Sequence, residues 1–382
     1  MKRGIAWGLA VLMWIPVFNF GGGKAEASGT WSQSEFIIST FQGVGEDHSV
    51  YPTLMQKMKD LGLNTTELYF LDRNDSLEAL AAADTVGMKV IVNELGDKAP
   101  LVNRFSNFQN KIYGTNSDSS IADAISFYSG HPSLYGYAVW DEPFPENIAA
   151  AKTVIGKFKA QAPDRLALIG ALPRDTSGTF ASLPQWTAYI DDYVDQIDLQ
   201  VMGFDYYPFA EVDAGTPLEQ TNVFENLGYI RQKALQKNIP IWNYIQSVGN
   251  LNETTIGSMT VDKIRLQVYY SLAYGAKAIS YYNVRSGLLT DTGAETALFN
   301  GTRQINEELK KLGPTLIGLT STGIYQTGNV YHPFDDDLNN QSLIESLPGD
   351  MLLGTFLNFG RPDLHSAGQP QLYRLQIRHD RV

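Results

Sequence analysis

Residues 134–143, LYGYAVWDEP, combine a strand-length apolar run with two adjacent carboxylates and a proline. The run from Leu134 to Trp140 is almost continuously apolar, which is typical of a strand buried on both faces of a parallel sheet. Asp141 and Glu142 follow where that strand leaves the core. Because active sites of α/β proteins form at the carboxyl ends of parallel strands, this stretch predicts a site at such an end.

The neighbouring carboxylates of Asp141 and Glu142 repel each other unless one is protonated or both have partners. General acid catalysis depends on such a separation of pKa values. The alternative interpretation of Asp141 is a helix cap, because an aspartate often precedes a first turn that contains proline. That alternative explains Asp141 alone better than it explains the whole run.

Short apolar stretches alternate with amphipathic stretches of helical length along most of the chain. The predicted strands are Phe36–Phe41, Thr65–Phe70, Lys89–Glu94, Leu134–Trp140, Arg165–Ala171, Ile197–Phe204, Ile239–Ile245 and Lys277–Tyr282. The predicted helices are Tyr51–Leu61, Ser76–Val86, Ile121–Tyr128, Glu146–Ala162, Gln185–Val194, Asn222–Lys237, Val261–Tyr274 and Glu295–Leu312. Eight strands, each followed by a helix, predict an α/β fold of the (β/α)8 TIM barrel type. An open doubly wound sheet is the alternative, but no G-x-G-x-x-G follows the first strand.

The pattern changes after Pro314. Residues 316–328, LIGLTSTGIYQTG, and residues 343–360, LIESLPGDMLLGTFLNFG, predict short strands with turns, as in part of a β-sandwich. The polar tail that follows shows no clear pattern. We therefore expect a signal peptide over residues 1–27, a barrel catalytic domain over 28–313 and a small β-rich region over 314–382, too short for a complete sandwich.

The N-terminus has the features of a secretory signal peptide. Lys2 and Arg3 precede the apolar residues 5–18, and residues 25–27, AEA, offer a small-x-small cleavage site. We therefore expect a secreted, extracellular protein without an integral membrane segment after cleavage. The sequence has no Cys, which excludes a lipid-modified cysteine and disulfides, so the core alone must stabilise the fold.

The formal net charge of −12 and the lack of Lys/Arg-rich runs make nucleic acids and anionic membranes poor candidate partners. The chain is rich in aromatic residues, with 20 Tyr, 18 Phe and 6 Trp. Their rings suit the apolar faces of sugars, but large cores use them too, so the count favours a carbohydrate ligand only slightly.

Carboxylates, amides and aromatic rings follow the ends of the predicted barrel strands. The candidate catalytic residues are Glu142, Asp141 and Asp205. The candidate substrate-binding residues are Trp140, Asn93, Glu94, Tyr69, Tyr207, Trp242, Tyr244, Gln246, Tyr282 and Asn283. Carboxylates perform acid–base chemistry, amides bind hydroxyl groups and rings stack on sugars, so this set predicts a carbohydrate site.

Other kinds of catalytic site have little support. The chain has neither the H-E-x-x-H spacing of a zinc site nor the G-x-S-x-G of a serine nucleophile. Asp335, Asp336 and Asp337 are compatible with calcium, but an exposed acidic turn is the simpler interpretation. We expect no metal and no cofactor, a carbohydrate substrate as the partner, and a monomer.

Four stretches resemble secreted bacterial glycoside hydrolases of the barrel superfamily around the family 42-like β-galactosidase catalytic domain. They are YGYAVWDEP (135–143), FDYYPF (204–209), PIWNYIQS (240–247) and RLQVYYSLAYGAKAISYYNV (265–284). The resemblance covers residues 36–328 and holds at the level of the superfamily. It implies a (β/α)8 barrel that acts on glycosidic bonds.

The chain departs from that pattern at two positions. Retaining members are expected to have Asn-Glu after strand four and a nucleophilic Glu after strand seven. Asp141 stands in place of the Asn and Gln246 in place of the nucleophile, whereas Glu142 matches the acid/base position. The resemblance therefore implies an acid/base role for Glu142 but leaves a double-displacement mechanism without its nucleophile.

The adjacent Asp-Glu pair is also similar to β-N-acetylhexosaminidases. In those enzymes the 2-acetamido oxygen of the substrate attacks the anomeric carbon, the Asp orients that group and the Glu protonates the leaving oxygen. This resemblance implies an assisting role for Asp141 and needs no nucleophile on strand seven. Inversion remains the other option, with Asp205 or Glu94 activating a water at about 6.5–9.5 Å from Glu142.

The sequence thus predicts a secreted glycoside hydrolase that cleaves O-glycosidic bonds of an oligo- or polysaccharide, with Glu142 as general acid/base and Asp141 assisting. The alternative is a non-catalytic carbohydrate-binding barrel derived from a glycosidase. Gln246 motivates that alternative, because loss of the nucleophilic Glu converts a catalytic scaffold into a binding one.

Overall fold

Eight parallel strands form a nearly closed barrel, which confirms the predicted fold class. The computed structural model describes residues 30–45, 47–69, 71, 73–93, 117–175, 178–211, 222–249, 259–327, 332–337, 347, 349, 351–358 and 371–378. The barrel strands are β1 (Ile37–Thr40), β2 (Thr65–Leu68), β3 (Lys89–Asn93), β4 (Leu134–Trp140), β5 (Leu166–Ala171), β6 (Met202–Asp205), β7 (Ile241–Gln246) and β8 (Ala276–Tyr282). Their order is β1-β8-β7-β6-β5-β4-β3-β2, so β1 and β2 flank the seam of the barrel.

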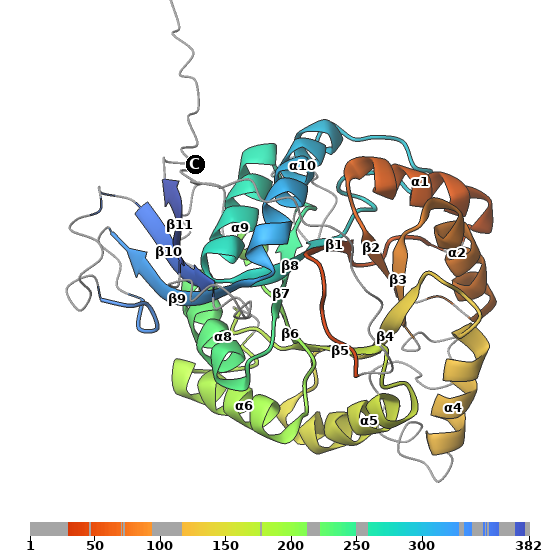
Figure 1. Ribbon diagram of the computed structural model, residues 1–382, viewed down its shortest axis with the longest axis horizontal. Helices are drawn as coiled ribbons and strands as arrows, with labels where there is room; N and C mark the ends of the chain where they lie inside the picture. Colours follow the sequence, from red (N-terminus) through yellow and green to blue (C-terminus); the bar gives the residue numbers. More distant parts are fainter. Residues whose placement is uncertain are drawn as a thin grey trace, which may run out of the picture.

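Helices surround the strands as an outer ring (Figure 1). They are η1 (His48–Val50), α1 (Tyr51–Leu61), α2 (Arg73–Val86), α4 (Ser117–Tyr128), η2 (Pro145–Asn147), α5 (Ile148–Gln161), α6 (Leu183–Gln196), α7 (Pro208–Glu211), α8 (Val223–Lys237), α9 (Val261–Ala273) and α10 (Phe299–Leu316). Within the described ranges, none of these helices is both long and apolar enough to cross a membrane.

Predicted and observed bounds differ by a few residues at several elements, and two of the differences have a clear physical cause. The sixth strand begins at Met202 rather than Ile197, because residues 197–201 form the connection from α6 and bury apolar side chains without being a strand. The last barrel helix does not end at Leu312 but continues through Pro314 to Leu316. Proline removes one helical hydrogen bond, but the packing of Gly313 against Phe36 and the burial of Leu316 keep the helix on the barrel.

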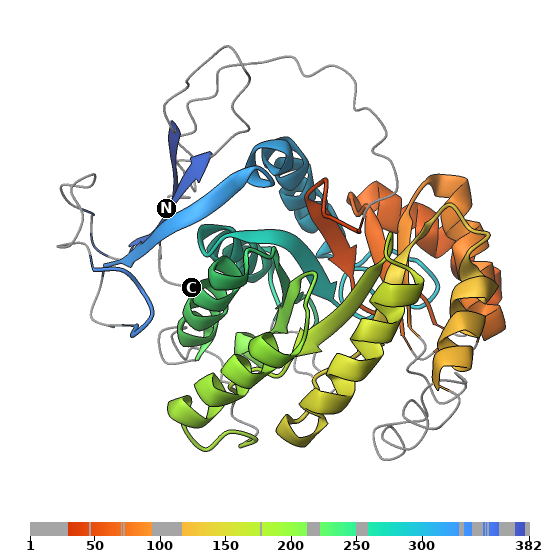
Figure 2. The same ribbon diagram turned by 60° about the horizontal axis from the view of Figure 1, so that its bottom comes forward.

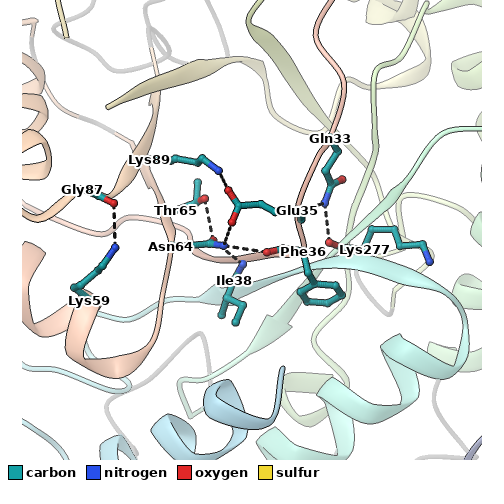
Figure 3. A network of polar contacts seen from close by, with 10 residues as sticks. All are labelled: Gln33, Glu35, Phe36, Ile38, Lys59, Asn64, Thr65, Gly87, Lys89 and Lys277. Atoms are coloured by element: carbon teal, nitrogen blue, oxygen red, sulfur yellow. Dashed lines mark hydrogen bonds and ion pairs between the residues drawn. The ribbon is translucent and has the colours of Figure 1, made fainter. Parts of the chain in front are cut away.

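Asn64 closes the seam at the N-terminal end of the barrel (Figure 3). Its side chain accepts a hydrogen bond from the backbone N–H of Ile38 at 2.9 Å and donates one to the carbonyl of Phe36 at 2.9 Å. Further along the seam, the N–H of Gly43 donates to the carbonyl of Glu67 at 3.1 Å. These bonds join β1 to β2 where the regular ladder stops.

Side chains fill the N-terminal half of the barrel interior. Ile37, Ile91, Leu166 and Trp242 belong to one buried cluster inside the barrel. The indole N–H of Trp242 donates to Gln33 Oε1 at 2.8 Å, which ties the N-terminal segment across this end. The opposite, C-terminal end of the barrel is therefore where a site can open to solvent.

A separate antiparallel sheet of three strands follows the barrel. It consists of β9 (Leu319–Gln326), β10 (Met351–Asn358) and β11 (Gln371–Arg378), in the order β11-β10-β9. The first two strands lie in the stretches predicted to be β-structure. The third lies in the polar tail of the region predicted to be β-rich, where the sequence shows no clear pattern. Tyr373, Leu375 and Ile377 alternate there with polar residues, and Leu375 is buried.

This sheet packs against the outside of the barrel beside α9, as Figures 1 and 2 show. Gly354 of β10 lies directly on the backbone of α9, because a Cβ atom there would lie 2.4 Å from the carbonyl oxygen of Ala273. Leu352 and Phe356 join the same hydrophobic cluster as the helices of the barrel. The guanidinium of Arg231 on α8 donates to Ser321 of β9 at 2.8 Å. The sheet and the barrel therefore share one core.

Candidate functional site

Three carboxylates meet at the C-terminal end of the barrel. Asp141 and Glu142 directly follow β4, and Asp205 is the last residue of β6. The backbone of Glu142 has a φ of 46°, a left-handed conformation that is uncommon for a residue with a side chain and concentrates at functional sites. The turn after β4 brings Glu142 across the mouth toward β6.

A hydrogen bond joins the carboxyl groups of Glu142 and Asp205. Burial and the charges of Asp205 and Asp141 raise the pKa of Glu142 to about 10. Burial and the charge of Asp141 raise the pKa of Asp205 to about 7, although hydrogen bonds from Glu142 and Tyr207 oppose that rise. Burial and mutual repulsion therefore favour a proton on this pair of carboxyl groups.

Asp141 has the lowest pKa of the three carboxyl groups. Burial raises its pKa to about 6, and its Oδ1 lies beside Gly170 of β5. Asp141 is therefore the more acidic of the two chain neighbours, and Glu142 is the one that more readily keeps a proton. Such a separation of pKa values between adjacent carboxyl groups is the arrangement that acid catalysis uses.

Aromatic rings surround the carboxylates. Phe41, at the end of β1, packs on Tyr69 with ring centroids 3.9 Å apart and on Tyr282 at 5.3 Å. Tyr282 in turn packs on Tyr207 at 4.8 Å, and Tyr244 meets Phe41 edge-on at 6.4 Å. The structure thus brings four predicted site residues, Tyr69, Tyr207, Tyr244 and Tyr282, together around the carboxylates. Phe41 joins them although the sequence analysis did not single it out.

The two predicted tryptophans lie elsewhere. Trp242 is fully buried inside the barrel and bonds Gln33 at the N-terminal end. Trp140 is buried in the cluster between the strands and the outer helices, because the register of β4 shifts between Ala138 and Trp140. The sequence alone does not reveal that shift, which turns the Trp140 ring away from the barrel axis.

The predicted amides of Asn93, Asn283 and Gln246 lie in three different environments. Asn93 is buried, and its side chain donates to the carbonyl of Ala138 at 3.5 Å. Asn283 donates to Gln42 Oε1 at 3.3 Å, and its Oδ1 atom has no hydrogen-bond partner among the described residues. Glu94, predicted beside Asn93, lies outside the described residues.

Gln246 uses its side-chain amide for backbone contacts. Its Nε2 donates to the carbonyls of Val248 and Gly249 at 3.0 and 3.2 Å, and its Oε1 accepts from the N–H of Phe209 at 3.1 Å. The residue is fully buried. At this position the chain therefore has an amide that stabilises the loops after β6 and β7.

Glu67 is a prominent polar residue of the barrel interior that was not predicted from the sequence. It is fully buried on β2, inside the barrel, and the hydroxyl of Tyr244 donates to its Oε2 at 2.9 Å. A signal was present in the sequence, because Glu67 lies two residues before Tyr69 on the same predicted strand. Side chains two apart on a strand point to the same face, so both had to face the barrel interior.

Within the described ranges, no group of three or more His, Cys, Asp or Glu residues is arranged to hold a metal ion. The charged groups at the mouth are instead arranged for proton transfer, and the rings around them for contact with an apolar face. This arrangement is chemically suited to protonating an oxygen atom of a ligand that enters the mouth.

Several known structures with a similar fold are glycoside hydrolases. A candidate α-L-fucosidase from Bacteroides thetaiotaomicron superposes with a TM-score of 0.53 at 12% identity, covering 77% of this chain and 98% of that one. An endo-β-1,4-mannanase from Thermotoga petrophila gives 0.51 at 10% identity, covering 90% and 97%. An endo-1,4-β-mannanase from Rhizomucor miehei gives 0.50 at 11% identity, covering 74% and 100%. No family model and no curated protein sequence matches the chain. At these identities the likeness is one of fold.

Proposed function

We propose that this chain is a secreted glycoside hydrolase that cleaves O-glycosidic bonds of an oligo- or polysaccharide, with Glu142 as general acid/base and Asp141 assisting. The observation that carries the proposal is the hydrogen-bonded pair of Glu142 and Asp205 beside Asp141 at the open end of the barrel. The glycosidase-type fold of the structural neighbours supports it.

Glu142 fits the acid because it keeps its proton at neutral pH. Burial and two neighbouring carboxylates raise its pKa to about 10, so the side chain can donate a proton to a leaving oxygen. Asp205 accepts the hydrogen bond of that carboxyl group and orients its proton. Once Glu142 has lost the proton, it becomes the base that activates water for the second step.

Asp141 fits the assisting group because it is the most acidic of the three carboxyls, with a pKa of about 6. An ionised carboxylate next to the anomeric carbon stabilises the positive charge that develops there. On a sugar with a 2-acetamido group it would also orient the attacking oxygen, as the similarity to β-N-acetylhexosaminidases implies. The bond between Glu142 and Asp205 favours this route over inversion with Asp205 as base, because inversion needs about 6.5–9.5 Å between the carboxyls for the water.

The test is a panel of aryl glycosides and bacterial polysaccharides that covers hexosamine, galactose, glucose and uronic acid units. Wild type should release product from at least one member, and Glu142→Gln should lower release from the polysaccharides, whose leaving oxygens need a proton, by about 10²- to 10⁴-fold. Glu146→Gln is the matched control, because Glu146 is an exposed carboxylate in the 3-10 helix that follows. Equal turnover by wild type and Glu142→Gln would remove Glu142 from the mechanism.

Product stereochemistry by NMR then separates the routes, since substrate assistance retains the anomeric configuration and direct water attack inverts it.

The second candidate is a non-catalytic carbohydrate-binding barrel. Gln246 favours it, because the amide at the position expected for a nucleophile is engaged in backbone hydrogen bonds. Saturable sugar binding by calorimetry, without product from any member of the panel, would support this candidate over the hydrolase.

A further inference from the structure

One buried carboxyl group takes no part in the mechanism proposed above. Glu67 lies in the middle of β2 with its side chain inside the barrel, and none of its surface is exposed. It contacts groups from several strands at once: Ser39 on β1, Tyr244 on β7 and Ser280 on β8. Burial and the charges of Asp141 and Glu67 raise the pKa of Tyr69, two residues further along the chain, so its phenol lies near Glu67.

The hydrogen bonds divide between the two carboxyl oxygens of Glu67. Oε2 accepts from the phenol of Tyr244 at 2.9 Å, and Oε1 accepts from the hydroxyls of Ser280 and Ser39 at 3.1 and 3.5 Å. Among the described residues, its hydrogen-bond partners are hydroxyl groups. A hydroxyl can accept as well as donate, so these partners can satisfy Glu67 with or without a proton.

The surroundings of Glu67 favour its protonated form. Burial raises its pKa to about 8, and the charge of Asp141 contributes to that rise, while the hydrogen bonds from the hydroxyls oppose it. A neutral Glu67 also spares Asp141 the repulsion of a second buried negative charge.

Tyr69 and Tyr244 connect this buried group to the mouth of the barrel. The phenol of Tyr244 hydrogen-bonds Glu67, and that of Tyr69 lies near it. The charge of Asp141 acts on both phenols. Their rings pack on Phe41, which belongs to the aromatic group around the carboxylates. Glu67 therefore influences how these two side chains are oriented. Their orientation in turn determines the shape of the aromatic group around the carboxylates.

We propose that Glu67 is a positioning residue of this site, a neutral carboxyl group that fixes the phenol of Tyr244, and the neighbouring Tyr69, close to Asp141. The inference rests on the proposed function and adds a residue to it. Catalytic groups must be held within a fraction of an ångström, and a displacement of about 1 Å by a change away from the chemistry can lower the rate about 100-fold.

The first test needs no substrate. Infrared spectra of wild type and Glu67→Gln at pH 7 are compared in the region of the protonated carboxyl C=O stretch. The proposal expects one protonated carboxyl band of the wild type to be absent from the variant. Spectra that differ only in the carboxylate bands would mean that Glu67 is ionised, and would overturn the proposal.

The second test asks whether Glu67 acts through Tyr244. A double-mutant cycle of Glu67→Leu and Tyr244→Phe is measured on kcat/KM, and each single change should lower it on the order of 100-fold. The double variant should lose little more than either single variant, because both remove the same contact. Multiplicative losses would overturn the proposal.

Tyr281→Phe is the matched control for Tyr244→Phe. Tyr281 is also buried, and its phenol donates to Asn306 at 2.6 Å on the side of the barrel that faces α10. It should lose stability as Tyr244→Phe does but keep wild-type kcat/KM. An equal loss of kcat/KM in both variants would mean that Tyr244 acts only through stability.

Should Glu67→Leu fail to fold, the pH profile of Glu67→Gln decides the question. The kcat/KM of wild type should fall relative to the variant as the pH rises through about 8, because only wild type gains a charge. A constant ratio would overturn the proposal.

Lack of turnover by wild type on every glycoside would refute the proposed function while leaving the infrared result intact, so the two failures are distinguishable.

Discussion

Replacement of Glu67 by glutamine should change how the stability of the protein depends on pH. Burial raises the pKa of Glu67 from 4.5 to about 8, whereas the unfolded chain keeps the ordinary value. Below pH 4.5 Glu67 is protonated in both the native and the unfolded state, so the protein has its full stability with respect to this group. As the pH rises through the window up to about 8, the unfolded state releases the proton while the native state retains it, so stability is lost.

The size of this effect follows from the two pKa values. Their separation is about 3.5 pH units, and each unit corresponds to about 1.4 kcal/mol, which gives about 5 kcal/mol in total. Glutamine has nearly the same shape and does not titrate. The free energy of unfolding of wild type should therefore fall relative to Glu67→Gln by several kcal/mol between pH 5 and 8, and then run parallel to it.

Urea unfolding of both proteins at intervals from pH 5 to 9 measures this difference. Using the difference between two proteins cancels the other carboxyl groups that titrate in the same range. Glu146→Gln controls for the same chemical change at an exposed side chain. A difference between wild type and Glu67→Gln that stays within about 1 kcal/mol across the range would refute the protonated state of Glu67.

Three further changes test other parts of the structure. Asp205→Asn should move the alkaline limb of the kcat/KM profile to lower pH, because the charge of Asp205 helps to raise the pKa of Glu142; an unmoved limb would contradict the pairing of the two. Asp141→Asn should abolish the acid limb near pH 6 and lower kcat/KM about 100-fold or more, and a surviving acid limb would assign it to another group. Gly354→Ala should lower the free energy of unfolding by about 1–3 kcal/mol, because the new Cβ would lie 2.4 Å from the carbonyl of Ala273; an unchanged melting temperature would show that the sheet does not press on α9.

The sequence predicted the barrel well because its strands carry a strong and repeated signal. The strand Leu134–Trp140 has the bounds expected for it, and the carboxylates after β4 and β6 lie at the same end, as parallel strands require. Strand bounds failed where apolar residues fill a connection, as between Ile197 and Met202. Burial alone does not distinguish a buried turn from a strand.

Which of the candidate residues lie together at the site was harder to predict from the sequence than the fold. The pattern around Trp140 gives no sign of the register shift in β4 that turns its ring outward. The amide of Gln246 has the chemistry of a sugar-binding group, but only the folded loops reveal that backbone atoms occupy it. The inward position of Glu67 was predictable, because it lies two residues before Tyr69 on the same strand. Its protonation depends on hydroxyl groups of strands that are distant in the chain.

The central claim is that Glu142 donates a proton to the leaving oxygen. Its most direct test is kcat/KM of wild type and Glu142→Gln on a pair of glycosides that differ only in leaving-group acidity. General acid catalysis contributes about 10²- to 10⁴-fold, so the variant should lose about that much on the poor leaving group and far less on a good one, which departs without a proton. Equal losses on both substrates would contradict the assignment of Glu142 as the general acid.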